Sequence, residues 1–109
     1  MTSWDSTVDV VIVGSGGGGM VAALATAGAG ADALVVQGVE AGGHRGVFAD
    51  DAGQSELSVL AALQLVGGTV DLPLIGAGSI MTGGALAAVL VAGAAAGQLG
   101  TAYLRCPEA

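Results

Sequence analysis

The most constraining feature of this sequence is that a glycine-containing cluster follows each of its short apolar runs. Runs such as VDVVIV and ADALVV have the length and composition of single buried strands. The clusters read GSGGGG, QGVEAGGHRG, GAGSI and GQLGT. Segments rich in Ala and Leu separate the runs and favour helices. The chain therefore predicts strand, turn and helix in repeated succession, which is typical of a parallel sheet.

The expected elements follow this order along the chain. We expect strands at 8–14, 31–38 and 71–78, a weaker strand at 94–100, and helices at 20–27, 55–67 and 82–93. Ser55 and Thr82 are the expected N-caps of the last two helices, and Gly93 the end of the last. The residues expected to share the buried face of the second helix are Leu57, Leu60, Ala61 and Val66.

This order predicts the α/β class, with parallel βα repeats. Four parallel strands form either half of a TIM (β/α)8 barrel or a small open Rossmann-like sheet. In both arrangements ligands bind at the carboxyl ends of the strands. All four glycine clusters fall on that edge, so we expect the functional site there.

Length and charge limit the possible partners. The chain has 109 residues, enough for one small domain, so we expect residues 1–109 to form a single α/β unit. Its net charge is −7, and Arg45 and Arg105 are its only Lys or Arg residues. Nucleic-acid binding needs basic residues to neutralise phosphates, so that class is excluded. A phosphate ligand stays open, because backbone N–H groups at helix N-termini bind phosphate without lysine.

The uncharged stretch 72–104 is long enough to raise the question of a membrane span. Pro73, the GAGS and TGG clusters and Gln98 interrupt it, so we expect no membrane segment. The N-terminus lacks a basic region before an apolar core, and the single Cys106 leaves no internal disulfide. We therefore expect a cytoplasmic protein.

The first glycine cluster has the G-x-G-x-x-G spacing at Gly14, Gly16 and Gly19, between a strand and a helix. In that context the glycines allow close approach of a pyrophosphate, although Gln37 stands where an acidic ribose ligand is expected. The first 36 residues resemble the FAD-binding N-terminus of 3-ketosteroid dehydrogenase and fumarate reductase-like flavoproteins. This resemblance implies a Rossmann-like βα start over residues 1–30 and FAD as an alternative cofactor. A glycine turn that binds nothing remains the other interpretation.

The later clusters carry a second resemblance. QGVEAGGHRG, then PLIGAGSIMTGG, then AGQLGT resemble the C-terminal half of nitronate monooxygenases, FMN-dependent barrels, over about residues 27–109. The resemblance implies βα repeats over residues 31–109 and oxidation of alkyl nitronates or nitroalkanes with O2. It implies His44 as the base that acts on the nitro compound, a role suited to imidazole. Flavin contacts are implied for Gln37, Gly42 and Gly43.

The same resemblance implies a phosphate site built from backbone N–H groups. The turn at Gly78 and Ser79 carries serine where the family has a second glycine, which makes a positive φ harder to adopt. The last motif completes the expected phosphate cup with Gln98, Leu99, Gly100 and Thr101. Phosphate sites after the last strands are recurrent in barrels.

Plainer interpretations stay open beside these. His44 could hold local loop structure, Glu40 and Arg45 could form a solvated ion pair, and Asp50 with Asp51 indicates a solvated loop rather than a metal site. Besides the nitronate monooxygenase activity, an FAD-binding module and a non-catalytic scaffold remain alternative functions. An open half-barrel exposes strand edges, so we expect self-association through them.

Overall fold

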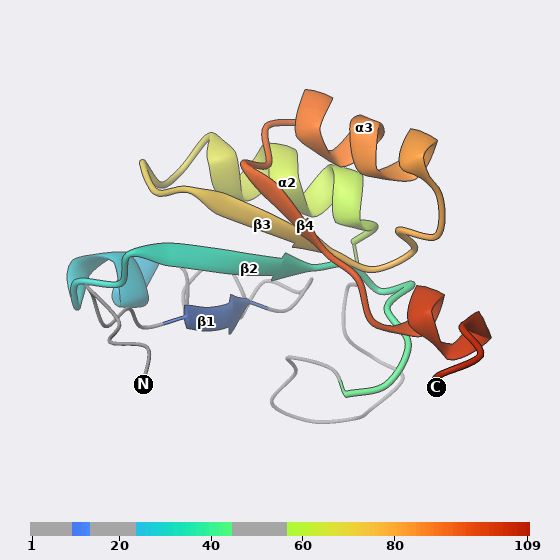
Figure 1. The fold of residues 1–109 in the computed structure, drawn as a ribbon. Helices are drawn as coiled ribbons and strands as arrows, with labels where there is room; N and C mark the ends of the chain where they lie inside the picture. The colour runs from blue at the N-terminus through green and yellow to red at the C-terminus, as the bar shows by residue number, and fades with distance from the viewer. Residues whose placement is uncertain (1–9, 14–23, 45–56) are drawn as a thin grey trace, which may run out of the picture.

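The computed structural model describes residues 10–13, 24–44 and 57–109. Within these residues the chain forms one sheet of four strands in the order β1-β2-β3-β4, and every neighbouring pair is parallel. Figure 1 shows helices α2 and α3 together on one side of this sheet. A doubly wound sheet reverses its strand order and carries helices on both faces, whereas a barrel keeps its strands consecutive. The arrangement therefore matches an open half-barrel.

The first two strands confirm the expected apolar runs. β1 (Val10–Val13) pairs with β2 (Ala33–Gln37), and residues 24–28 before β2 are helical. Leu34, Val35 and Val36 of β2 are all buried, as expected for a strand covered on both faces. The start of the helix expected at 20–27 lies outside the described residues.

Helix α2 (Val59–Gly67) begins later than the sequence predicts. Its N-cap is Ser58, whose Oγ accepts a hydrogen bond from the Ala61 N–H at 3.3 Å, so the prediction of Ser55 as the cap was wrong. Of the expected buried face, Val66 is buried, and Leu57, which lies just before the helix, is half-buried and packs against the core. Leu60 was predicted wrongly, because it is 41% exposed, and Ala61 is only half-buried. The residues that α2 buries are Val59, Ala62, Leu63 and Val66. Almost every residue of this helix is apolar, so two different sets of residues at the helical spacing fit a buried face equally well.

The second half of the chain follows the predicted order closely. β3 (Leu74–Ala77) leads to α3 (Gly83–Val91), which is capped by Thr82 through a 3.1 Å hydrogen bond from the Ala85 N–H. The helix ends before Gly93, whose φ of 111° suits glycine. β4 (Ala96–Gln98) and the short 3-10 helix η1 (Thr101–Arg105) complete the described chain.

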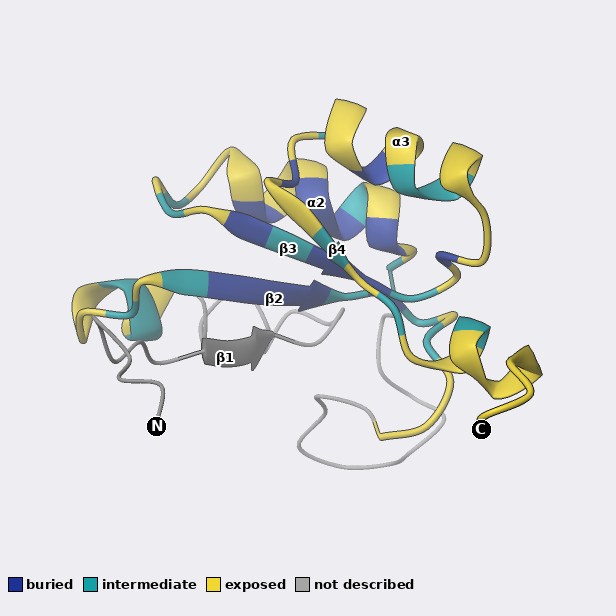
Figure 2. Cartoon of the chain, viewed as in Figure 1, coloured by how far each residue is buried: buried dark blue, intermediate teal, exposed yellow. Residues whose placement is uncertain are grey.

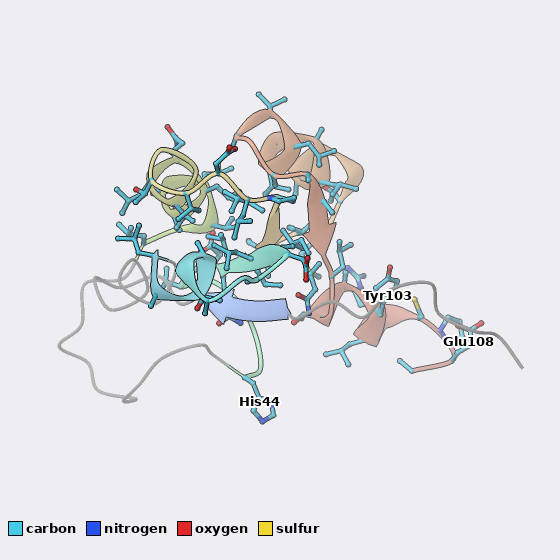
Figure 3. All side chains as sticks on the ribbon, turned by 90° about the vertical axis from the view of Figure 1, so that its left-hand side faces the viewer. His44, Tyr103 and Glu108 are labelled. Atoms are coloured by element: carbon cyan, nitrogen blue, oxygen red, sulfur yellow. The ribbon has the colours of Figure 1, made fainter. Side chains whose placement is uncertain are left out.

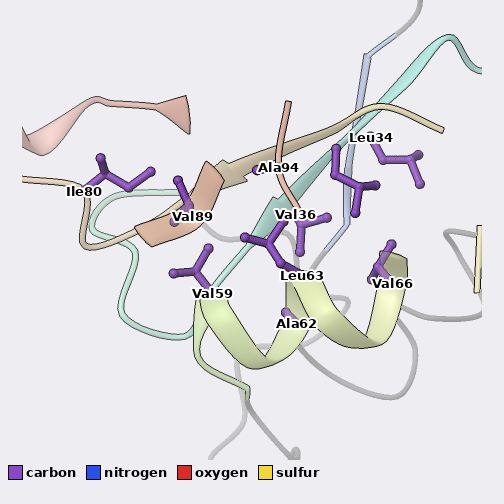
Figure 4. Packing of buried hydrophobic residues seen from close by; sticks show 10 residues of the cluster. Leu34, Val36, Val59, Ala62, Leu63, Val66, Ile80, Val89 and Ala94 are labelled. Carbon is purple, nitrogen blue, oxygen red and sulfur yellow. The ribbon is translucent and has the colours of Figure 1, made fainter. Parts of the chain in front are cut away.

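The core lies between the sheet and the two helices (Figures 2 and 4). Leu34 and Val36 of β2 meet Leu63 of α2 and Val89 of α3 in one cluster of buried side chains. Since strand side chains alternate, Val35 and Gln37 point to the opposite face of the sheet. No helix in the described part of the chain is long and apolar enough to cross a bilayer.

Candidate functional site

A cavity of about 230 Å³ lies at the carboxyl ends of β2, β3 and β4. Its wall comes from the segments that follow these three strands, far apart in sequence. The lining consists of Gln37, Ala41, Gly42, His44, residues 77–81 and residues 98–102. The edge that the glycine clusters predict as the site is therefore the edge that carries the cavity.

The floor of the cavity is a row of paired residues from three strands. Gln37 pairs in register with Ala77, and Ala77 pairs with Gln98. Paired residues project from the same face of a sheet, so two amide side chains flank one methyl group. Amides both donate and accept hydrogen bonds, which makes this row suited to a heterocycle with mixed donors and acceptors.

The loop after β2 is fixed by backbone and carboxylate contacts. The Gly38 N–H donates to the Ala77 carbonyl at 2.9 Å, and the Ala41 N–H donates to the Gly38 carbonyl at 3.1 Å. A Cβ on Gly38 would overlap both the Glu40 carboxylate and the Val59 backbone. Only glycine fits this crossing of the loop with the start of α2.

Glu40 has a structural partner that the sequence did not reveal. Both carboxylate oxygens accept from the Val59 N–H, at 3.0 and 3.2 Å. A carboxylate at this position satisfies an unpaired N–H and complements the positive end of the helix dipole. Arg45, the expected ion-pair partner of Glu40, lies outside the described residues, as do Asp50 and Asp51.

His44 stands at the rim of the cavity. The Gln37 Nε2 donates to the His44 carbonyl at 2.8 Å, so the backbone of His44 is tied to the end of β2. The side chain is exposed, and Figure 3 shows the imidazole projecting away from the ribbon. The loop is thus held at the cavity while the ring remains accessible to small molecules in solvent.

The turn after β3 adopts two successive left-handed conformations, with φ of 115° at Gly78 and 58° at Ser79. Gly78 packs against the β2 loop, since a Cβ there would stand 3.2 Å from the Ala41 nitrogen. Ser79 adopts the positive φ that the sequence made doubtful, and Ile80 is buried directly after it. A left-handed serine is costly, and such conformations cluster at ligand sites.

The end of β4 meets the same loop from the other side. A Cβ on Gly42 would stand only 2.7 Å from the Thr101 Oγ1. Gly100 and Thr101 line the cavity where η1 begins. The absence of a side chain at Gly42 therefore keeps the Thr101 hydroxyl at the cavity wall.

Most of the predicted site residues meet at this cavity. Gly43 lies beside it with φ of 82°, and Gly14, Gly16 and Gly19 lie outside the described residues. The sequence missed Ala41, Ala77, Met81 and Ala102, because an alanine or methionine carries no chemical signal of a site. Among the described residues no cluster of three or more metal-ligating side chains occurs.

The donor set at this cavity fits an anionic group held by backbone. Its lining contains no Lys or Arg, so a phosphate would depend on N–H groups of the turns at residues 78–80 and 99–102 and on the hydroxyl groups of Ser79 and Thr101. The Gly42 contact shows a wall that an added Cβ would fill. At 230 Å³ the cavity is smaller than a typical pocket for a whole cofactor, about 300–1,000 Å³, and suits one end of such a ligand.

Consecutive parallel strands and a site at their carboxyl ends place the chain in the (β/α)8-barrel class. The family model for nitronate monooxygenase matches residues 4–109. The chain belongs to the nitronate monooxygenase family, which is flavin-dependent.

Individual relatives agree with this assignment. Nitronate monooxygenase from Pseudomonas aeruginosa is 50% identical over 80 residues, which cover 73% of this chain and 23% of the relative. That from Paraburkholderia phytofirmans is 52% identical over 80 residues, covering 73% and 22%. A crystal structure of nitroalkane oxidase from Streptomyces ansochromogenes matches with a TM-score of 0.82 and 45% identity, over 94% of this chain and 29% of that one.

These matches bear on two expectations from the sequence. The chain spans less than a quarter of the length of the two curated relatives. The resemblance of the first 36 residues to 3-ketosteroid dehydrogenase-like flavoproteins is not supported, because the nitronate monooxygenase model already matches from residue 4. The G-x-G-x-x-G spacing alone is weak, since any strand–glycine–helix turn produces it easily.

Proposed function

We propose that this chain carries the flavin site of an FMN-dependent nitronate monooxygenase, which oxidises alkyl nitronates or nitroalkanes with O2. The observation that supports this most directly is the meeting of all three sequence motifs at one cavity. Gln37 with the GGH loop, the Gly78–Ser79 turn and the segment 98–101 line it from three successive strands.

FMN fits the chemistry of this cavity better than FAD does. A terminal phosphate needs several N–H donors converging on one point, which the turns after β3 and β4 can supply together. We assign to the phosphate the turn at Gly78 and Ser79 and the motif at residues 98–101. Gln37, Gly42 and Gly43 are the residues proposed for the remainder of the flavin. The bound flavin would supply the redox capacity that these side chains lack.

His44 is the proposed base. A neutral imidazole nitrogen can accept the proton from the carbon next to a nitro group, and the charge that forms stays on an exposed, solvated ring. Gln37 supports this role by holding the His44 carbonyl, which keeps the loop at the cavity rim. The imidazole is exposed at the rim of the cavity, so a small substrate can approach it from solvent.

The test is the visible spectrum of the purified chain before and after incubation with FMN or FAD and desalting. Retention of FMN in preference to FAD is the expected result, and the released flavin is identified by chromatography. Gly42→Leu fills the wall beside Thr101 and should remove FMN retention, while Gly83→Ala, where space is open, should leave it intact. Preference for FAD, or no uptake of either flavin, would overturn the assignment.

A further inference from the structure

The side chain of Gln98 projects from the face of the sheet that the helices leave uncovered. Gln98 is the last residue of β4, and it pairs with Ala77, which pairs in turn with Gln37. Leu34 and Val36 of β2 belong to the core beneath the helices, so the alternation of the strand turns Gln37 to the opposite face. Because paired residues share a face, Gln98 projects from that opposite face as well.

The residue before Gln98 supports this orientation. A Cβ on Gly97 would stand 2.6 Å from the Leu86 Cδ1 of α3 and 3.2 Å from the Ile80 Cδ1 of the core. Residue 97 therefore faces the helices, and the next residue faces away from them. In a (β/α)8 barrel the face opposite the helices is the interior, and side chains at the carboxyl ends of its strands reach the active site.

The rest of the motif belongs to the loop rather than to the strand. Leu99 packs against the core, and Gly100 and Thr101 lie where η1 begins. Loops after the late strands supply the phosphate sites of barrels, whereas the side chains that contact the reacting part of a ligand come from strand ends. The motif at residues 98–101 thus divides at the end of β4 into a strand-end side chain and a loop backbone.

The chemistry of the amide also favours a heterocycle over a phosphate. An amide offers N–H donors and a carbonyl acceptor, and the pyrimidine part of a flavin carries both N–H and carbonyl groups. A phosphate dianion only accepts hydrogen bonds, so it would leave the amide carbonyl unused. The Gln37 Nε2 already donates to the His44 carbonyl at 2.8 Å, whereas the side-chain amide of Gln98 forms no hydrogen bond with any described residue.

We propose that the Gln98 side chain binds the ring of the flavin and not its phosphate, which makes Gln98 a specificity-determining residue for the heterocycle. The backbone N–H groups of residues 98–101 and the Thr101 hydroxyl stay at the phosphate. Neighbouring strands lie about 4.8 Å apart, so the ring is held between two amides whose Cα atoms are about 10 Å apart, across the methyl group of Ala77. This inference rests on the proposed FMN site and divides it into two ends.

The first experiment follows the ¹⁵N-labelled chain by NMR during separate titrations with riboflavin, which has the ring without the phosphate, and with inorganic phosphate. The side-chain amide signals of Gln98, identified by their loss in Gln98→Glu, should shift with riboflavin and not with phosphate. The backbone amide of Thr101 should shift with phosphate. The side-chain amide of Gln64, which donates to the Leu60 carbonyl on α2 at 3.0 Å, is the control and should shift with neither.

The outcomes of this titration separate the inference from the function on which it rests. If the chain binds FMN but the Gln98 side-chain signals do not shift with riboflavin, the inference is wrong and the FMN site stands. If the chain binds no FMN, both are wrong.

Two variants of conserved size test the same division by affinity. Gln98→Leu removes the amide and should raise the Kd of FMN and the Kd of riboflavin equally, by about five- to tenfold, the effect of one hydrogen bond. Thr101→Val removes the hydroxyl and should raise the Kd of FMN alone. Far-UV circular dichroism checks that both variants fold. A Gln98→Leu variant that leaves the riboflavin Kd unchanged would overturn the inference; if it does not fold, the NMR titration of the unmodified chain decides.

Discussion

Gly42 and Thr101 come from different βα units and touch at the carboxyl edge of the sheet. A Cβ on Gly42 would stand 2.7 Å from the Thr101 Oγ1, closer than nonbonded atoms normally approach. The segment after β4 can therefore pack this closely against the GGH loop only because residue 42 is glycine. This contact couples two of the three motifs that define the site.

Replacing Gly42 with Ala should push the Thr101 hydroxyl away from the cavity wall. We expect the free energy of unfolding to fall by about 1 kcal/mol, because a flexible side-chain end can move aside. We expect FMN affinity to fall about tenfold. Adding Thr101→Ala should restore the stability, since the Thr101 Cβ lies 3.9 Å from the added methyl group, but not the affinity. Urea unfolding and flavin titration measure the two effects; equal rescue of both would contradict the proposed role of the hydroxyl.

Ser79 should respond to substitution according to backbone conformation rather than side-chain size. Its φ of 58° costs a non-glycine residue about 1–2 kcal/mol, and its side chain is exposed. Ser79→Gly should stabilise the chain by about 0.5 kcal/mol after the entropy lost by glycine is subtracted. Ser79→Asn should be near neutral, and Ser79→Val should destabilise by about 2 kcal/mol. Urea unfolding of the series gives the order; a stable valine variant would contradict the left-handed conformation.

Glu40 should stabilise α2 through its charge as well as through its hydrogen bonds. Glu40→Gln keeps an acceptor for the Val59 N–H but removes the interaction with the helix dipole, at about 0.5–1 kcal/mol. Glu40→Ala removes both and should cost about 1–2 kcal/mol. Glu108→Gln, an exposed change near the C-terminus, is the charge-matched control and should have no effect. A loss of stability equal to that of the control would show that Glu40 does not act as a cap.

His44→Ala and His44→Gln should separate proton transfer from cofactor binding. Loss of a general base lowers turnover by about 10²–10⁴-fold. We expect this loss with a neutral nitroalkane and a much smaller one with a preformed nitronate, which has already lost its proton. FMN affinity should stay unchanged, since the imidazole projects away from the ribbon. Oxygen consumption with both substrates measures the difference, and unchanged turnover of the nitroalkane would exclude His44 as the base.

The sequence predicted which segments form strands and helices better than it predicted which side of a helix faces the core. Short β-branched runs and cap residues such as Thr82 carry local signals, and both were confirmed. The buried stripe of α2 was misplaced, because a helix that is apolar all round gives no local clue to its orientation. Which side faces the sheet depends on tertiary contacts such as Leu63 against Val36.

Within the site, the sequence located the motifs but not the contacts between them. The clusters indicated one edge because all parallel strands end there. The contact of Gly42 with Thr101 and the cap formed by Glu40 depend on which segments cross in space, and neither residue type signals its partner. Ser79 shows the opposite difficulty, because its local preference argued against the positive φ that it adopts between the tightly packed Gly78 and the buried Ile80.

Hydrogen bonds between the β2 loop and the start of α2 determine which part of the segment between them can vary in length. The Val39 N–H donates to the Leu57 carbonyl at 2.9 Å, and Glu40 holds Val59, so the two ends of the intervening segment are joined independently of its own sequence. Doubling the length of such a closed loop costs only about 0.6 kcal/mol. The number of residues between positions 45 and 56 can therefore change at little cost, whereas Gly42 and His44, which line the cavity, have to be kept.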